Sequence, residues 1–217
     1  MSPFSWPPLS KKSREMRRIF SAIHSTGAWG EAESTSGPGS TRARAASFLP
    51  DLIALTQSLR VGTLLDAPCG DFHWVAPLAD AVDHYVGVDV VPALVTTNRR
   101  QFSSPRRQFL CRDICRHRLP AADLILCRDA LVHLSEHDIA AALQNLRRTG
   151  AEYLLTTTFV GERENPNIET GAWRPLNLQG RPFCFPAPLA LIDERCQHTG
   201  GAYADKRLGL WRFNAIR

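Results

Sequence analysis

Long apolar runs are absent from this chain of 217 residues. No stretch approaches the roughly 18 consecutive apolar residues that a membrane-spanning helix needs. The first 20 residues contain prolines and basic residues, but no apolar block ahead of a small-residue cleavage site, so they do not resemble a signal peptide. We therefore expect a cytoplasmic protein that has no membrane partner.

Lysine is also scarce. Only three of the 26 basic residues are lysines, so arginine supplies most of the positive charge behind the net charge of +5. A basic balance can indicate nucleic-acid binding. However, no run of arginines is interleaved with aromatic residues that could stack on bases. A skewed composition with scattered, solvated arginines explains the charge more simply, so we do not expect a nucleic-acid partner. The basic cluster in residues 11–18 is the best exception.

Paired metal-ligand spacings are missing as well. The six cysteines form no C-x-x-C pair, so structural zinc and disulfides are not expected, and we predict no metal site. Buried free thiols are the expected state of these cysteines. With 44% hydrophobic residues, the chain can build the full core of one soluble domain.

A complete glycine-rich phosphate loop is absent too, but the apolar runs and acidic residues that flank such a loop are present. The apolar residues Leu64 and Leu65 lead to Asp66, and a Pro68-Cys69-Gly70 turn follows. A second run, 85–89, ends on Asp89, close to the ~20-residue spacing of a ribose-binding acid after a nucleotide-binding turn. Asp71 would repel a pyrophosphate, and phosphates need bare backbone amides. A cofactor with ribose hydroxyls and no phosphate, such as S-adenosylmethionine, fits this turn better.

Four segments in order resemble the class I, Rossmann-like S-adenosylmethionine-dependent methyltransferases. Residues 64–70 are similar to the first motif of that family, and 86–89 to its second strand. Residues 109–114 resemble the adenine-binding segment, and 123–134 the fourth strand with its loop. The resemblance covers roughly residues 61–160 and implies S-adenosylmethionine as the cofactor. It also implies an α/β fold, doubly wound, with a mostly parallel seven-stranded sheet and an antiparallel C-terminal hairpin.

Apolar periodicity supports alternating strands and helices. It predicts strands over 62–66, 85–89, 107–110, 122–127 and 152–158, and helices over 11–25, 42–59, 73–80, 91–101 and 136–148. Such alternation is typical of a parallel sheet covered by helices on both faces. The tail 202–214 is predicted to form a hairpin that turns near Lys206 and Arg207. We divide the chain into an N-terminal helix and flap, 1–41, and a methyltransferase domain, 42–217.

Two segments lack periodicity but contain aromatic residues. Residues 26–41 carry Trp29 and are either a surface loop with an anchoring indole or a flap over the cofactor. Residues 160–186 follow a strand end, where α/β sheets bind ligands, and long loops of this kind are often functional. We predict that the two segments close over the cofactor and over the methyl acceptor respectively.

The cofactor residues are assigned from the ends of the predicted strands. A carboxylate at Asp89 could accept both ribose hydroxyls, although an acid there could also cap a helix. Asp113 could accept the adenine amino group or be an ordinary loop acid. Asp66 could hold the methionine ammonium or only the turn. The full predicted set is Asp66, Pro68, Gly70, Asp89, Val90, Asp113, Ile114 and Arg128.

Catalytic residues are expected directly after the fourth strand, where the transferred methyl should emerge. His133 has a pKa suited to a general base, although it could equally be a packed histidine. Asp129 and Arg128 join it, as an ion pair or as a holder for an anionic acceptor. For the acceptor itself we predict Trp29, Phe159, Asn165, Trp173 and Arg174. Arg174 would suit a carboxylate or phosphate, and Trp173 a flat or apolar part.

The function predicted on these grounds is methyl transfer from S-adenosylmethionine to oxygen or nitrogen of a small-molecule acceptor. Two alternatives stay open: an RNA or protein methyltransferase that uses the basic N-terminal helix, and a non-catalytic cofactor-binding protein of the same fold. A homodimer is included among the partners to be tested.

Overall fold

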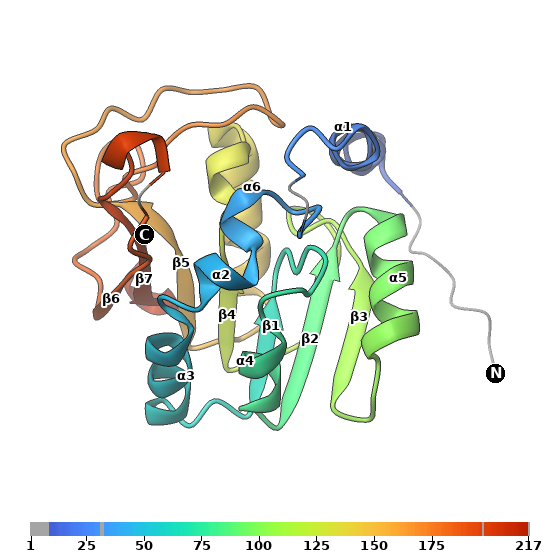
Figure 1. Ribbon diagram of the computed structural model, residues 1–217. Helices are drawn as coiled ribbons and strands as arrows, with labels where there is room; N and C mark the ends of the chain where they lie inside the picture. The colour runs from blue at the N-terminus through green and yellow to red at the C-terminus, as the bar shows by residue number, and fades with distance from the viewer. Residues whose placement is uncertain (1–8, 31–32, 197, 217) are drawn as a thin grey trace.

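The computed structural model describes residues 9–30, 33–196 and 198–216. A single seven-stranded sheet runs through the centre of the molecule (Figure 1). Its strands are β1 (Thr63–Asp66), β2 (His84–Asp89), β3 (Arg107–Cys111), β4 (Leu124–Cys127), β5 (Tyr153–Phe159), β6 (Ala190–Asp193) and β7 (Lys206–Arg212). The strand order is β3-β2-β1-β4-β5-β7-β6.

The first five strands are parallel, and β7 is antiparallel to both β5 and β6. The predicted fold class, with its antiparallel C-terminal hairpin, is therefore confirmed. The chain reverses direction across the sheet between β1 and β4, because β1 leads outward to β2 and β3 whereas β4 leads to β5. A reversal of this kind leaves a crevice at the carboxyl ends of the strands, which is where open α/β sheets bind ligands.

Helices cover both faces of the sheet (Figure 1). They are α1 (Lys11–Thr26), α2 (Arg42–Ala45), α3 (Leu49–Ser58), α4 (Ala76–Asp80), α5 (Pro92–Phe102) and α6 (Glu136–Arg147). One core contains side chains of α3, α4 and α5, and the other contains those of α6, so the sheet is buried on both sides. Strands buried in this way carry nearly continuous apolar residues, as in the fully buried β4.

Local capping explains where several helices begin. Ser10 accepts a hydrogen bond from the Ser13 amide at the start of α1, and Ser135 accepts one from the Asp138 amide at the start of α6. The helix predicted over 42–59 is instead two helices, because the chain leaves helical geometry at Phe48 and restarts with Pro50 in the first turn of α3. The helix predicted over 73–80 begins only at Ala76, after Phe72 has adopted a positive φ.

The C-terminal hairpin is present, but its predicted position was wrong. The chain does not turn near Lys206 and Arg207, because these two residues already belong to β7. The other strand of the hairpin is β6, which lies before residue 202 and is only four residues long. Lys206 is buried and paired with carboxylates, so a basic residue that resembled a turn is part of the interior.

Residues 160–186 contain no helix or strand, as predicted. They replace a crossover helix between β5 and β6 and are ordered by polar side chains. The Asn165 side-chain amide donates to the carbonyls of Asn177 and Arg181, at 2.8 and 2.7 Å, and its oxygen accepts from the Asn177 amide. Within the described part of the chain, none of the helices is long and apolar enough to cross a membrane.

Candidate cofactor and acceptor site

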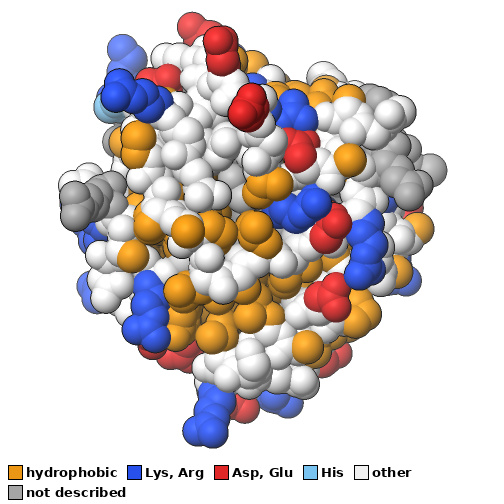
Figure 2. All heavy atoms as spheres, turned by 90° about the vertical axis from the view of Figure 1, so that its left-hand side faces the viewer, with side chains coloured by type: hydrophobic (Ala, Val, Ile, Leu, Met, Phe, Trp, Pro, Cys, Tyr) orange, Lys and Arg blue, Asp and Glu red, His pale blue; other side chains and the backbone are white. Residues whose placement is uncertain are grey.

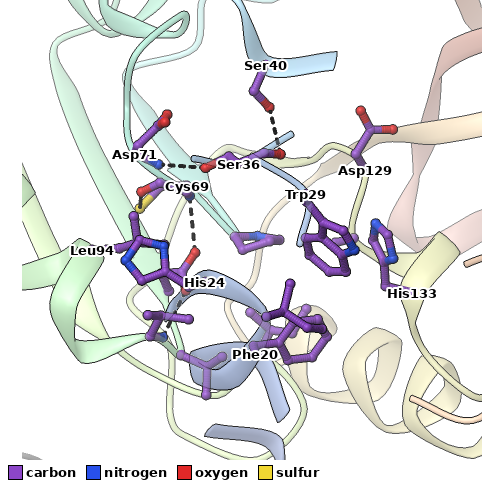
Figure 3. A pocket seen from close by; sticks show the side chains of 18 of the residues that line it. Phe20, His24, Trp29, Ser36, Ser40, Cys69, Asp71, Leu94, Asp129 and His133 are labelled. Carbon is purple, nitrogen blue, oxygen red and sulfur yellow. Dashed lines mark hydrogen bonds between the residues drawn. The ribbon is translucent and has the colours of Figure 1, made fainter. Parts of the chain in front are cut away.

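A cavity opens at the carboxyl edge of the sheet, at the reversal between β1 and β4 (Figure 3). The space between its lining atoms is about 1050 Å³, counted together with the solvent at its open mouth. Its walls come from the residues that follow β1, β2, β3 and β4, and from the N-terminal segment. Helix α1 covers it with Met16, Phe20, Ile23 and His24.

The turn after β1 approaches the flap closely. Gly70 has a φ of +52°, and a Cβ at this position would lie 2.4 Å from the Ser36 hydroxyl oxygen, so glycine is required. Its carbonyl accepts a hydrogen bond of 2.8 Å from the Asn98 side chain of α5. Asp71 accepts from the Ser34 hydroxyl and the Thr35 amide, at 2.8 and 2.9 Å. Asp71, whose charge would repel a pyrophosphate, therefore links the flap to this turn by hydrogen bonds.

Asp89 lies at the end of β2 and is 5% exposed. Its two carboxylate oxygens accept hydrogen bonds from the backbone amides of Gly70 and Val91, at 3.1 and 2.9 Å. Burial raises the pKa of Asp89 to about 6. The carboxylate lines the cavity with further lone pairs that can accept from hydroxyl groups.

Asp66 ends β1 and is more deeply enclosed. The Tyr85 hydroxyl donates to it at 2.6 Å. Burial raises the pKa of Asp66 to about 7, and the neighbouring charge of Asp89 adds to the shift. Two adjacent carboxylates with raised pKa values make this end of the cavity receptive to positive charge.

Substitution of Asp66 tests how much its buried charge destabilises the folded protein. Because the folded-state pKa lies above the ordinary 3.8, the native protein binds the proton more tightly than the unfolded chain does, and the free energy of unfolding falls as pH rises from about 4 to 7. We expect Asp66→Asn, which can still accept from Tyr85, to raise the free energy of unfolding by about 2–4 kcal/mol at pH 8 and by little at pH 4. Urea denaturation at both pH values measures this, and a gain that does not depend on pH would contradict it.

Asp113 follows β3 and is almost fully buried. Its carboxylate accepts from the Cys115 amide at 2.9 Å and pairs with Arg116 at 3.3 Å. Arg116 also contacts Asp138 at 2.6 Å, so the acid is connected to α6. The Asp113 backbone amide donates to the His117 ring at 2.9 Å. Both roles considered for Asp113 are compatible with this position, since it lines the cavity and also orders its own loop.

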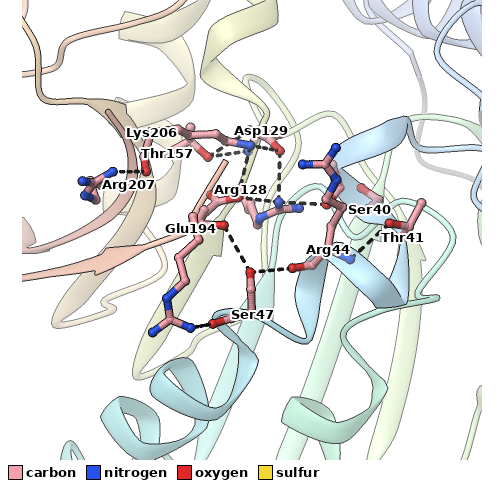
Figure 4. Close-up of polar contacts among 12 residues, drawn as sticks. Ser40, Thr41, Arg44, Ser47, Arg128, Asp129, Thr157, Glu194, Lys206 and Arg207 are labelled. Atoms are coloured by element: carbon pink, nitrogen blue, oxygen red, sulfur yellow. Dashed lines mark hydrogen bonds and ion pairs between the residues drawn. The ribbon is translucent and has the colours of Figure 1, made fainter. Parts of the chain in front are cut away.

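Arg128 and Asp129 belong to a quartet of charges with Glu194 and Lys206, of which all but Asp129 are buried (Figure 4). Arg128 Nη2 contacts the Glu194 carboxylate at 2.6 Å and donates to the Gly39 carbonyl of the flap at 2.9 Å. The guanidinium lies 4.9 Å from the ring centres of both Phe48 and Trp74. The Nη2 group and the faces of the guanidinium are therefore engaged by protein groups, whereas Nε has no hydrogen-bond partner among the described residues.

Asp129 has a φ of +50°, an unfavourable conformation for a residue other than glycine. Its amide donates to the Thr157 hydroxyl at 2.8 Å, and Lys206 Nζ contacts its carboxylate at 2.7 Å. Burial alone would raise the pKa of Asp129, but Lys206 and Arg128 hold it well below its ordinary value. Asp129 is thus ionised at neutral pH.

His133 lies in the short 3-10 turn after β4 and lines the cavity. Its ring stacks on Trp29, with centroids 4.0 Å apart, and its Nδ1 is 2.9 Å from the Ala172 carbonyl. Burial lowers its pKa, so the ring is neutral at pH 7. Because a carbonyl can only accept, Nδ1 carries the proton and Nε2 holds the lone pair.

The cavity brings together all eight predicted cofactor residues, the three predicted catalytic residues and Trp29. It does not include Phe159, Asn165, Trp173 or Arg174. Trp173 is 41% exposed and packs against Phe159 and Tyr203. Arg174 is 2% exposed and donates to the carbonyls of Leu131 and Val132, at 3.3 and 3.1 Å. Through these two hydrogen bonds, Arg174 holds the backbone of the short turn that contains His133.

Three contributions were not predicted from the sequence. Helix α1 lines the cavity with its apolar residues Met16, Phe20 and Ile23. Their spacing predicted a helix, but it did not indicate which part of the protein the helix covers. Ser36 contacts the Gly70 turn through a bond between distant parts of the chain. Glu194 and Lys206 join the site from β6 and β7, where a single acid and a single lysine give no pattern.

Residues 64–151 match the family model of a methyltransferase domain. No curated protein matches the chain significantly. Among solved structures, the chain is similar to magnesium protoporphyrin IX methyltransferase from Synechocystis PCC 6803 with bound S-adenosylmethionine, with 16% identity, a TM-score of 0.53 and coverage of 77% of this chain and 84% of that one. It is also similar to human N-acetylserotonin methyltransferase in complex with S-adenosylmethionine, with 14% identity, a TM-score of 0.54 and coverage of 92% and 56%.

A third similar structure, the methyltransferase domain of bacterial CtHen1, matches at 16% identity with a TM-score of 0.47, over 53% of this chain and 66% of that domain. The chain thus spans less than two thirds of the length of two of these proteins. The family match and the fold together confirm the predicted resemblance. Over residues 64–151 the chain matches a methyltransferase domain, and its fold is similar to that of solved structures that hold S-adenosylmethionine.

Proposed function

We propose that this protein transfers a methyl group from S-adenosylmethionine to oxygen or nitrogen of a small molecule. The observation that carries the proposal is the convergence of four strand ends on one cavity, with a neutral histidine and a stacked indole at its border. A cavity covered by α1 favours a small acceptor over a macromolecule, because a polymer would need an open surface.

In this proposal the cofactor lies across the ends of β1, β2 and β3. The Asp89 carboxylate accepts from the ribose hydroxyls, and Asp113 with Ile114 holds the adenine. Asp66 and the Gly70 turn face the methionine part, whose ammonium and sulfonium groups suit the two acids with raised pKa values. Methyl transfer then needs in-line positioning, and the acceptor gives up its proton to a base.

Titration calorimetry tests the cofactor assignment. We expect S-adenosylhomocysteine to bind and NAD not to bind, since the turn offers no glycine-rich phosphate cradle. Binding of NAD without binding of S-adenosylhomocysteine would overturn the proposal. Methyl transfer is then assayed with labelled S-adenosylmethionine against a panel of small acceptors and against RNA, which separates the small-molecule proposal from the RNA alternative.

The ribose role of Asp89 makes a further prediction. Asp89→Ala should weaken S-adenosylhomocysteine binding by about 1.5–3 kcal/mol, because hydrogen bonds to a charged acceptor have this strength. Calorimetry on the folded variant measures the change. Asp51→Ala is the matched control, because Asp51 is an exposed acid whose partner is the surface residue Arg195. If Asp89→Ala binds as tightly as the control, Asp89 does not hold the ribose.

The closing roles of 26–41 and 160–186 are tested by proteolysis. We expect cleavage within these segments in the free protein and slower cleavage with S-adenosylhomocysteine bound, because ligand contacts with the flap stabilise its closed state. Residues 31 and 32 of the flap lie outside the described residues, so cut sites are mapped by mass spectrometry. Equal cleavage rates with and without the ligand would argue against closure.

A homodimer and a cytoplasmic location remain parts of the proposal. Figure 2 views the side of the molecule that carries α3, β6 and β7, where hydrophobic side chains gather over the lower centre. On the edge strand β6 and just before it, Leu191 is 47% exposed and Leu189 is 59% exposed. Light scattering on the purified chain measures the mass, and a monomeric mass at high concentration would remove the dimer.

A further inference from the structure

The charges around the cavity are unevenly divided. Its described lining includes five aspartates but only two arginines. Arg128 is held by Glu194, by the Gly39 carbonyl and between two aromatic rings. Arg112 follows β3, beside Asp113, and donates to the Cys111 carbonyl at 3.0 Å. An anionic acceptor would therefore meet carboxylates and no uncommitted arginine next to His133 among the described lining residues.

Arg174, which the sequence analysis assigned to an anionic acceptor, contacts the protein backbone instead. Arg174 is buried behind the segment 131–133 and donates to its carbonyls. It does not line the cavity. A carboxylate or phosphate on the acceptor is thus left without its expected partner.

The groups that do face this end are an acid, a base and aromatic rings. Figure 3 shows Asp129, Trp29 and His133 together on one side of the cavity, with Cys69, Asp71 and Leu94 on the other. Asp129 keeps a negative charge, and its side chain is 26% exposed, although Lys206 lies 2.7 Å and Arg128 3.5 Å from one of its oxygens. Trp29 offers an indole face, which attracts cations as well as apolar groups, whereas the ring of Trp74 already carries the Arg128 guanidinium. The Nε2 lone pair of His133 is available as a proton acceptor.

We infer that the methyl acceptor is an amine carried on an aromatic or apolar body. Its ammonium form is attracted to the cavity's aspartates, Asp129 among them, and to the indole of Trp29, whereas a carboxylate is repelled and an alcohol, which is neutral, gains no charge attraction. His133 Nε2 takes one proton from the ammonium, which leaves a neutral amine. The nitrogen lone pair then forms the new bond to the methyl carbon, the C–S bond breaks with its electron pair going to sulfur, and S-adenosylhomocysteine remains. This inference rests on the proposed function and narrows it to N-methylation.

The test compares three probes of matched shape: benzylamine, benzyl alcohol and benzoate. Each is titrated into the full-length protein saturated with S-adenosylhomocysteine, and binding is followed by NMR. We expect benzylamine to bind about tenfold or more tightly than the other two. Asp129→Asn should remove most of this preference, while Asp193→Asn, at an exposed acid outside the cavity, should leave it unchanged.

Each outcome decides the question. If S-adenosylhomocysteine does not bind, the proposed function itself fails. If it binds but the three probes bind equally, or none binds, or benzoate binds best, the proposed function survives and the amine inference is overturned. Should Asp129→Asn not fold, Trp29→Leu replaces it. That variant should retain the cofactor product and weaken benzylamine by about tenfold, and an unchanged benzylamine affinity would contradict the inference.

Discussion

Replacement of His133 by alanine is expected to lower the turnover number by about a hundredfold or more, while the affinity for S-adenosylhomocysteine changes little. The imidazole is neutral, its Nδ1 proton is committed to the Ala172 carbonyl, and its Nε2 is free to receive a proton from the acceptor. Steady-state kinetics with labelled S-adenosylmethionine, once an acceptor is identified, measures the loss. The cofactor affinity is measured separately by calorimetry.

A second variant separates catalysis from packing. In His133→Asn, the side-chain amide can still donate to the Ala172 carbonyl, but no basic nitrogen replaces Nε2. If His133 is the base, both variants should be equally slow, although the asparagine variant should be the more stable of the two. If His133 only packs against Trp29, the asparagine variant should retain most of its activity per folded molecule, and the assignment as a base would be wrong.

Glu194→Ala is expected to reduce the free energy of unfolding by about 3–5 kcal/mol, the scale observed when one member of a buried ion pair is removed. Glu194 neutralises Arg128 and Lys206 at 2.6 and 3.2 Å, in a region where its own side chain is 3% exposed. Without it, two buried cations would share the single carboxylate of Asp129. Urea denaturation at neutral pH measures the change.

The matched control for this prediction is Glu152→Ala. Glu152 pairs with Arg212 at 3.4 Å on the surface, where both side chains are more than half exposed. Exposed pairs contribute roughly 0–1 kcal/mol, so this variant should unfold almost like the parent protein. If the two glutamate variants lose the same stability, the quartet does not act as a unit. Glu194→Gln adds a comparison in which the hydrogen bonds persist but the charge is removed.

Most of the fold could be predicted from local sequence patterns. The apolar runs that became β1 to β5 and the amphipathic stretch that became α6 were predictable because side-chain periodicity depends only on neighbouring residues. The strand ends could then be placed at one edge of the sheet, which put Asp66, Asp89, Asp113 and His133 in one cavity. Those residues were predictable because topology, rather than side-chain detail, brings strand ends together.

What could not be predicted depends on contacts between distant segments. Arg174 looked like an anion-binding residue because an arginine beside a tryptophan in a long loop has the right chemistry. Its direction is decided by the carbonyls of residues 131 and 132, about forty positions earlier. The misplacement of the C-terminal hairpin has the same origin. Lys206 can be interior only because Asp129 and Glu194 neutralise it, and no local pattern reveals that partnership.

The quartet also has a consequence for the order in which the protein is made. Arg128 and Asp129 emerge from the ribosome early, but Glu194 follows Arg128 by 66 residues and Lys206 follows Asp129 by 77. Until those residues arrive, the loop after β4 holds an arginine and an aspartate without their main partners. Synthesis is directional, so the central strands can pair while the reaction end of the cavity stays unfinished. The site becomes complete only when the last strand of the sheet has been translated.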